Sequence, residues 1–229
     1  MGILQRLTDL LRPKRNADAG ARDAGAAQPE DAEAQEAALR ERLHEDPNDL
    51  QAFAQLAELI RWRTESAEQQ DPLIAEATGS DVDARIRAAQ WALAEELAGN
   101  PRAWHPLIEL ARLSLDDDHE AALRRLGTAC ERDRSGRALE EGIKMLRGQH
   151  LPAEALALGV GHWAPSHQSP EAGRQVVLAA LDADRPDEAR THLQNLAEYG
   201  AEQPGTAEVV AELEPFVAAA QERAGRGGS

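Results

Sequence analysis

The stretches LPAEALALG (residues 151–159) and RPDEARTHL (185–193) each carry a proline that is followed two residues later by Glu-Ala. Pro152 and Pro186 lie 34 residues apart, and the residues around them superpose at the same offset. Aligned in this way are Gly142 with Val176, Ile143 with Val177, Leu146 with Ala180, Glu154 with Glu188 and Ala155 with Ala189, and one period earlier Glu120 and Ala121. One structural unit therefore recurs along the chain.

Composition and periodicity both favour helices. Apolar residues make up 42% of the chain and aromatic residues only 3%, with much Ala, Leu and Glu, so we expect an all-α protein. Helices are predicted at about 30–45, 49–63, 82–98, 103–115, 119–133, 136–148, 152–163, 170–183, 186–199 and 206–224. Asp49, or Asn48 before it, is a candidate N-cap, and residues 64–80 are predicted to form a long loop.

A helix-turn-helix period of 34 residues resembles that of the tetratricopeptide repeat superfamily, over roughly residues 35–215. The residues that match the repeat pattern are Phe53, Leu56, Ala57, Ile60, Ala88, Trp104, Leu107 and Ala111, with Pro47 and Pro101 near the unit ends. Pro106 and Gly142 depart from the pattern. The resemblance implies a right-handed α-solenoid of about four stacked antiparallel helical hairpins, a fold that is built as a binding surface.

Four regions are expected along the chain. Residues 1–15 form a basic amphipathic helix whose apolar stripe is Ile3, Leu4, Leu7, Leu10 and Leu11. Residues 16–29 are small and polar and are expected to form a flexible linker. The helical-repeat domain spans 30–222, and 223–229 are expected to be a disordered tail.

Charge and cysteine content exclude several classes of function. The formal net charge of -16 argues against nucleic-acid binding, and no apolar run is long enough to span a membrane. One cysteine and no secretory signal indicate a reducing cytoplasm, and the Arg- and Ala-rich composition suggests a bacterial origin. The segment 1–15 is predicted to give at most weak peripheral contact with the inner face of the membrane, to dock on a partner, or to pack on its own solenoid. Arg6 argues against myristoylation.

The sequence contains no recognisable catalytic or cofactor motif. Cys130 lies in an amphipathic stretch and is expected to be a core residue. His162 and His167 lack a third ligand at helical spacing, and the acidic run at 115–121 is expected to cap a helix, so no metal site is predicted. The adjacent Glu140 and Glu141 are interpreted as a solvated helix face. We therefore expect a protein that is not an enzyme and that uses no cofactor.

The repeat register places cations together. In the resembled family, positions 2, 5, 9 and 12 of each first helix line the concave groove. Here they include Arg137, Glu140, Lys144 and Arg147 in the third unit, Glu171, Arg174, Leu178 and Leu181 in the fourth, and Arg61 and Arg112 at position 12 of the earlier units. Such a basic strip could bind carboxylates of a partner. Alternatively, an arginine at position 12 lies in the last turn of its helix and interacts favourably with the helix dipole. The Lys-and-Asn arrangement that clamps a C-terminal carboxylate in some family members is not reproduced.

These observations lead to two functional hypotheses. The first is an adaptor whose concave face binds an acidic peptide or protein segment through Arg61, Arg112, Arg137, Lys144, Arg147 and Arg174. The second is a regulatory subunit or assembly factor that packs permanently in a larger complex through the neighbourhoods of Trp62, Trp91, Trp104 and Trp163. The partner and the oligomeric state remain open.

Overall fold

The computed structural model describes residues 29–70 and 79–227, and within these ranges the chain is entirely helices and turns, without a β-strand. The helices are α2 (Pro29–Glu45), α3 (Leu50–Gln70), α4 (Gly79–Ala98), α5 (His105–Ser114), α6 (His119–Arg132), α7 (Arg137–Gly148), α8 (Pro152–His162), α9 (Pro170–Asp182), α10 (Pro186–Tyr199) and α11 (Thr206–Gly227). This confirms the all-α class. The predicted N-terminal stripe of Ile3, Leu4, Leu7, Leu10 and Leu11, and the linker before Pro29, lie outside the described residues.

The chain divides into two compact units, 1–35 and 36–229. Of the first unit, the structure describes only residues 29–35, the beginning of α2. The second unit holds the remainder of α2 and all later helices. The division thus falls within α2, a few residues after the boundary at residue 30 that the sequence suggested.

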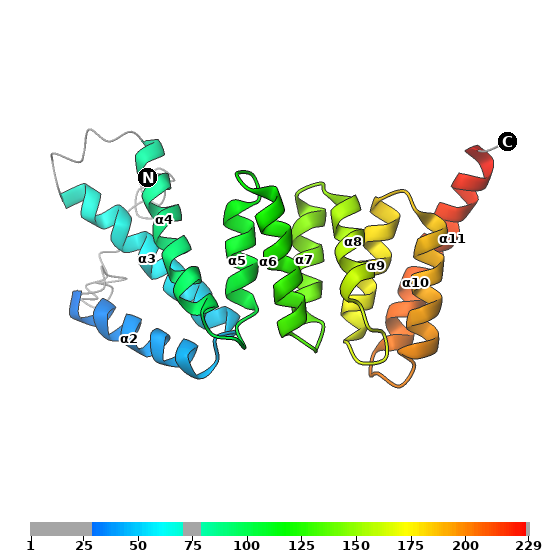
Figure 1. The fold of residues 1–229 in the computed structure, drawn as a ribbon, viewed down its shortest axis with the longest axis horizontal. Coiled ribbons are helices and arrows are strands. Elements are labelled where there is room, and N and C mark those ends of the chain that lie inside the picture. The colour runs from blue at the N-terminus through cyan, green and yellow to red at the C-terminus, as the bar shows by residue number, and fades with distance from the viewer. Residues whose placement is uncertain (1–28, 71–78, 228–229) are drawn as a thin grey trace, which may run out of the picture. The chain divides into compact units, whose positions relative to one another are not determined.

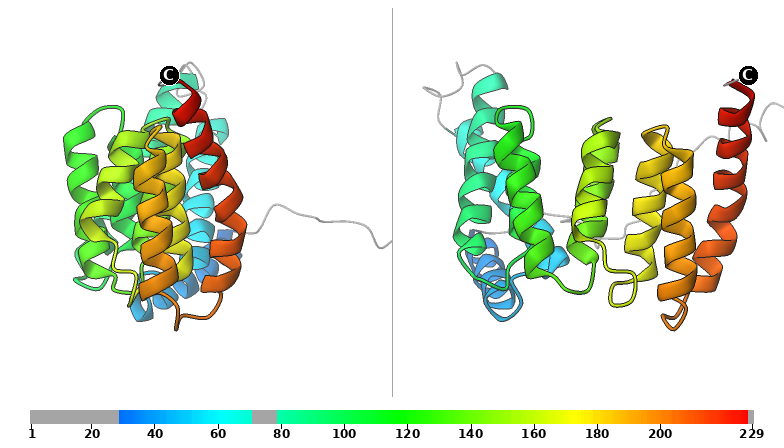
Figure 2. Two further views of the ribbon diagram at one scale, coloured as in Figure 1. Left: turned by 90° about the vertical axis from the view of Figure 1, so that its right-hand side faces the viewer. Right: turned by 45° about the vertical axis from the view of Figure 1, so that its right-hand side comes forward.

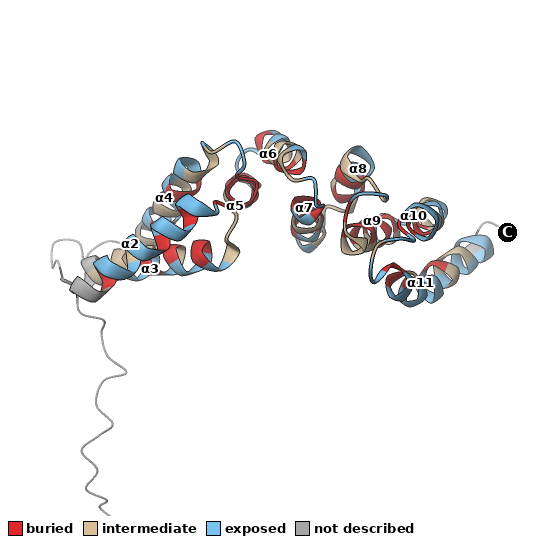
Figure 3. Cartoon of the chain, turned by 90° about the horizontal axis from the view of Figure 1, so that it is seen from below, coloured by how far each residue is buried: buried red, intermediate tan, exposed pale blue. Residues whose placement is uncertain are grey.

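Within the second unit, consecutive helices from α3 to α11 pack on one another, as do alternate helices. Helix α5 contacts α7, α7 contacts α9, and α9 contacts α11, while α6 contacts α8. Figures 1 and 2 show α7 to α11 standing side by side with alternating direction. Figure 3, which looks along the helices, shows α6 and α8 on one side of the row and α7 and α9 on the other. We call α5, α7, α9 and α11 the first helices, and α4, α6, α8 and α10 the second helices.

The core is continuous between these two rows. Its fully buried large side chains include Leu126, Leu139, Ile143, Leu146, Val176, Val177, Leu193, Leu196 and Leu213. The residues that align at the 34-residue offset occupy equivalent places, since Pro152 and Pro186 each begin a second helix and Ala155 and Ala189 are both fully buried. A proline is tolerated there because the first turn of a helix leaves its N–H groups unpaired.

The turns after α7 and α9 repeat the same backbone geometry. His150 has φ of 58° and Asp184 has φ of 56°, a left-handed conformation that non-glycine residues seldom adopt. In each turn the next amide closes back onto the helix, with Leu151 N donating to Leu146 O at 3.0 Å and Arg185 N to Ala180 O at 2.9 Å. The two turns lie 34 residues apart, so the repeat extends to backbone conformation.

Two side chains fasten the turn between α4 and α5. Asn48 Oδ1 accepts from the backbone N–H groups of Trp104 at 2.7 Å and His105 at 3.0 Å, and its Nδ2 donates to Arg102 O. From the other side, Arg132 Nη1 donates to the carbonyl oxygens of three residues, Ala98, Asn100 and Ala103. The N-cap of α3 is Asp49, which accepts from Ala52 N at 2.9 Å. Asn48 therefore caps a distant helix instead of its own.

Three helix ends differ from the sequence prediction. Helix α3 continues to Gln70 and α4 begins at Gly79, so every described residue of the loop expected at 64–80 is helical. The residues that extend α3, such as Glu65 and Ala67, are good helix formers. At the other end of the chain, α11 continues to Gly227 and includes residues 223–227 of the expected tail. Pro215 lies inside α11 and removes one of its backbone hydrogen bonds.

Candidate partner-binding face

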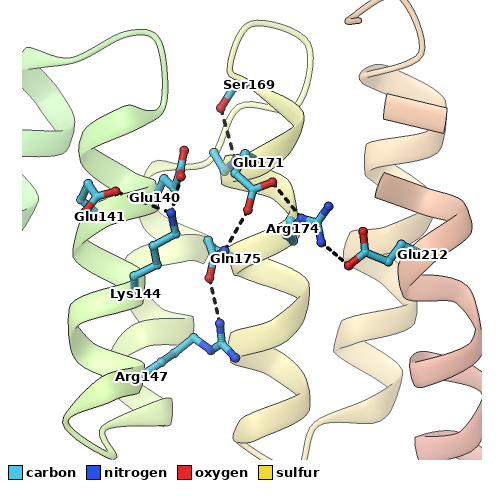
Figure 4. A network of polar contacts seen from close by, with 10 residues as sticks. Glu140, Glu141, Lys144, Arg147, Ser169, Glu171, Arg174, Gln175 and Glu212 are labelled. Carbon is cyan, nitrogen blue, oxygen red and sulfur yellow. Dashed lines mark hydrogen bonds and ion pairs between the residues drawn. The ribbon is translucent and has the colours of Figure 1, made fainter. Parts of the chain in front are cut away.

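The first helices carry most of the cations that the sequence placed in one strip, and the structure pairs nearly all of them with carboxylates of the same chain. Lys144 and Arg147 lie on α7, Arg174 on α9 and Arg112 on α5. Figure 4 shows Lys144 and Arg147 on α7 and Arg174 on α9, each directed at different polar partners. Their partners determine what the face can bind.

Arg174 joins α9 to α11. Its Nε donates to Glu171 Oε2 at 2.8 Å, and its Nη1 pairs with Glu212 across to α11 (Figure 4). The hydrogen bond to Glu212 raises the pKa of Arg174, and the same bond lowers the pKa of Glu212. Both groups are therefore held in their charged forms, and the guanidinium is already occupied on two sides.

Arg147 joins α7 to α9. Its Nε donates to Asp182 Oδ2 at 2.7 Å, and its Nη1 donates to Gln175 Oε1 at 2.8 Å. Gln175 is buried, and its Nε2 donates to Glu171 Oε1 at 3.1 Å, so the series of hydrogen bonds continues from Arg147 to Glu171. The polar contacts thus run without interruption from α7 through α9 to α11 (Figure 4).

Lys144 is paired within its own helix. Its Nζ lies 2.5 Å from Glu140 Oε1 and 3.6 Å from Glu141 Oε1. Burial lowers the pKa of Lys144, but the hydrogen bond and charge of Glu140 outweigh it and the pKa is raised. Glu140 and Glu141, which the sequence analysis interpreted as a solvated helix face, are the ion-pair partners of this lysine.

The remaining strip residues differ among themselves. Arg112 Nε lies 3.3 Å from Glu109 Oε2, and Arg61 Nη2 lies 2.5 Å from Glu58 Oε1. Arg137 stacks over the Trp104 ring at 6.0 Å and has no carboxylate within ion-pair distance among the residues described. Arg112 and Arg147 do lie in the last turn of their helices, as the dipole explanation requires, but Arg61 does not, because α3 continues to Gln70.

Five of the six predicted strip residues therefore form ion pairs with carboxylates of the same chain. The strip thus carries carboxylates beside its cations and is not a positive surface. Each exposed pair contributes little to stability, since water screens the charges and two long side chains lose freedom. A partner's carboxylate can replace Glu212 or Glu140 only by exchange.

Grooves lie between neighbouring first helices. The groove between α9 and α11, called the α9–α11 groove, has a volume of about 730 Å³. Its walls include Leu178, Leu181 and Phe216, which is 58% exposed, with Arg174 at its edge. A smaller groove of about 250 Å³ lies between α5 and α7, beside Arg112 and Lys144. Leu178 and Leu181 are the groove positions that the repeat register predicted for the fourth unit.

A groove that the register did not predict lies on the side of the second helices. This α4–α6 groove has a volume of about 480 Å³ and is lined by Arg87, Ala88, Trp91, Leu113, Ser114, Asp117, Asp118 and Arg125. The Arg125 guanidinium lies 5.0 Å from the centre of the Trp91 ring, and its Nη1 donates to Ser114 Oγ at 2.9 Å. Arg87 and Trp91 share one face of α4 because they are four residues apart. That spacing was the available sequence signal.

The buried titratable groups are structural in character. Cys130 is buried, and desolvation raises its pKa to about 12. His105 is buried between the Phe53 and Trp104 rings, and burial lowers its pKa. Within 29–70 and 79–227 no three His, Cys, Asp or Glu side chains are grouped so that they could hold a metal ion.

The four tryptophans are buried to different extents. Trp104 is 5% exposed, Trp91 and Trp163 are half-buried, and Trp62 is 39% exposed. Trp163 stacks edge-on against His192 at 5.7 Å. Trp104 and Trp163 thus contribute to internal packing, and Trp62 is the tryptophan most accessible to a permanent partner.

Comparison of the chain with family models, with curated proteins and with solved structures gives no match. Among the residues that the structure describes, no helix has the length and apolar character needed to cross a membrane.

Proposed function

We propose that the chain is a non-enzymatic scaffold of the α-solenoid type, with tetratricopeptide-like hairpins, that binds an acidic segment of a protein partner. The observation that carries the proposal is the pairing of alternate helices: α5, α7, α9 and α11 contact one another in turn and leave grooves between them. Stacked hairpins share a core and expose a long surface, and such a surface is suited to an extended or helical segment.

The ion-pair network supports this proposal in a specific way. It links α7, α9 and α11 through Arg147, Gln175 and Arg174, so the surface is held in one arrangement before a partner arrives. A preorganised surface loses less conformational entropy on binding. Because the cations are already paired, we propose binding that is moderate in strength and sensitive to salt.

Salt dependence tests the acidic partner. Purified full-length chain serves as bait at low ionic strength, and each captured protein is then made recombinantly and titrated with the chain by calorimetry. For an acidic segment the affinity falls steeply between low and high ionic strength, since the screening length shrinks from about 10 Å at 0.1 M to about 3 Å at 1 M. Affinity that does not change with salt contradicts a charge-based partner.

A charge swap tests the first-helix face without breaking its cross-link. The double variant Arg174→Glu with Glu212→Arg keeps an ion pair between α9 and α11 but exchanges the positions of the two charges. If an acidic segment lies along the α9–α11 groove, the swap weakens binding while thermal stability stays close to that of the natural chain. Arg226, which pairs with Glu222 near the end of α11, offers the control swap.

A stably bound subunit of a larger assembly is the second candidate. Phe216 favours it, because a phenylalanine that is 58% exposed beside an apolar groove gains most from permanent coverage. Gel filtration of the chain from its native source distinguishes the two. Elution as a species far larger than 24.8 kDa indicates a permanent complex, whereas elution at that mass supports a transient scaffold.

A further inference from the structure

The α4–α6 groove holds more arginines without a carboxylate partner than the described grooves on the first-helix face. Arg87 and Arg125 both line it, and among the described residues neither has a carboxylate within 4.0 Å. In the α5–α7 groove, by contrast, Arg112 and Lys144 are both paired. In the α9–α11 groove Arg174 is paired, and Arg223, within the described part of the chain, donates only to the Ala219 carbonyl. In a chain with net charge -16, two unpaired arginines facing one hollow are available for an external anion.

Arg125 is also held in place. Ser114 is buried, its hydroxyl donates to Leu110 O at 2.8 Å, and it accepts from Arg125 Nη1 at 2.9 Å. The guanidinium is half-buried against Trp91, so its orientation is fixed from two directions. A guanidinium has five N–H donors, and only one of them is used here. The free donors of a fixed, partly dehydrated guanidinium suit a carboxylate, which can accept two hydrogen bonds in parallel.

Two acidic side chains, Asp117 and Asp118, also line the groove. Asp118 caps α6 by accepting from Ala121 N at 3.0 Å, and Asp117 precedes it in the turn. Arg125 comes six residues after the start of α6, which is about 9 Å along the helix axis. Arg125 is therefore separated from Asp118 along α6, so a bound carboxylate can reach Arg125 while a basic or amide group of the segment faces Asp117.

We propose that the α4–α6 groove is the carboxylate-binding site of the scaffold: Arg87 and Arg125 take one acidic side chain of a partner protein, and Trp91 and Leu113 contact the apolar residue beside it. The inference rests on the proposed function and places the acidic segment on the second helices. Of the six strip residues, Arg147 and Arg174 then serve to link the first helices to one another.

The test is binding of a fluorescent acidic peptide, of alternating glutamate and leucine, to the full chain by fluorescence anisotropy. A peptide with glutamine in place of each glutamate is the probe control. Arg87→Gln and Arg125→Gln are each expected to weaken binding about tenfold to a hundredfold, as the loss of a charge-assisted contact implies. Arg124→Gln is the matched control, since Arg124 neighbours Arg125 on α6 but pairs with Glu120.

Arg87 is exposed, so its variant is expected to fold even if removing Arg125 disturbs packing on Trp91; circular dichroism checks both. If Arg87→Gln and Arg125→Gln bind like the natural chain and the Arg174–Glu212 swap binds weakly, the site is on the first helices and this inference fails while the scaffold proposal stands. If the natural chain binds the glutamine peptide as well as the acidic one, both fail. Displacement by inorganic phosphate at far lower concentration than by glutamate, at constant ionic strength, overturns the assignment to carboxylates.

Discussion

At the scale of single residues, burial explains the state of the one cysteine. Cys130 packs in the core on α6, where desolvation, and then the charge of Asp133, raise the pKa of its thiol to about 12. The thiolate is the reactive form of cysteine, so a thiol that stays protonated is inert. The sequence predicted this core position from the amphipathic pattern around it, and the structure confirms it.

The thiol of Cys130 is therefore expected to resist a disulfide reagent at pH 8 in the folded chain and to react at once in denaturant. The pKa of the Cys130 thiol is higher in the folded chain than in the unfolded chain. The thiol therefore contributes its full stabilisation below the unfolded pKa of about 8.5, and this contribution is lost as pH rises toward 12. The unfolding free energy should fall by about 1.4 kcal/mol per pH unit in that window. In the variant Cys130→Ala, the unfolding free energy should fall less steeply with pH in this window. Rapid labelling of Cys130 in the folded protein would contradict the burial argument.

At the scale of helices, close packing depends on residues that have no side chain. A Cβ added at Gly173 on α9 would meet Leu196 Cδ1 at 2.9 Å and Trp163 Cζ2 at 3.0 Å. Gly148, the last residue of α7, has nothing within 4 Å of the corresponding position. The two glycines form a matched pair for testing how tightly α9 packs against its neighbours.

Gly173→Ala is expected to destabilise the fold by about 1–3 kcal/mol, since the packed rings and methyl groups must move. Gly148→Ala is expected to be neutral or to stabilise by up to about 1 kcal/mol, since alanine favours the helix. Chemical denaturation of both variants measures the difference. Equal stability of the two would show that α9 and α10 adjust freely around the added methyl group.

Several helix ends were predictable because local residues set them. Pro152, Pro170 and Pro186 each begin a helix, and Gly99 and Asn100 follow the end of α4, as the sequence indicated. The loop predicted at 64–80 is wrong for residues 64–70, because this stretch contains good helix formers and no glycine or proline to end α3. Proline, glycine and capping residues mark positions where a helix can end, but a helix need not end at the first of them.

At the scale of the whole molecule, the partners of the charges could not be read from the chain. The repeat register placed Arg147 and Arg174 on one face, but their partners Asp182 and Glu212 lie 35 and 38 residues away. Which carboxylate meets which arginine depends on how each helix rotates against its neighbours, and helical periodicity leaves that rotation open. For the same reason the unpaired Arg87 and Arg125 could not be recognised.

Stability of the whole molecule should also depend on two histidines in separate parts of the fold, the buried His105 and the half-buried His192. Burial lowers the pKa of His105, which lies near Glu109, Arg112, Glu141 and Arg137, and burial likewise lowers the pKa of His192. Since both folded pKa values are depressed, their stabilising effect is complete above about pH 6.5 and is lost as pH falls.

The melting temperature is therefore expected to be level from pH 8 to 7 and to decrease as the pH drops below about 6.5, before most carboxylates titrate. In His105→Phe, which keeps an aromatic ring between Phe53 and Trp104, the decrease should be smaller. Differential scanning calorimetry at a series of pH values measures both chains. A parallel decrease in the two would assign the effect to other groups.

The fastening of the turn between α4 and α5 limits where the chain can be cut. Asn48 reaches this turn from before α3 and Arg132 reaches it from the end of α6, so the joint is completed by residues far apart in the sequence. A fragment that begins at α5 loses the cap on its first helix, and one that ends before α6 loses three hydrogen bonds to the turn. The smallest piece that preserves this joint runs from 48 to 132, and the hairpins are not interchangeable modules.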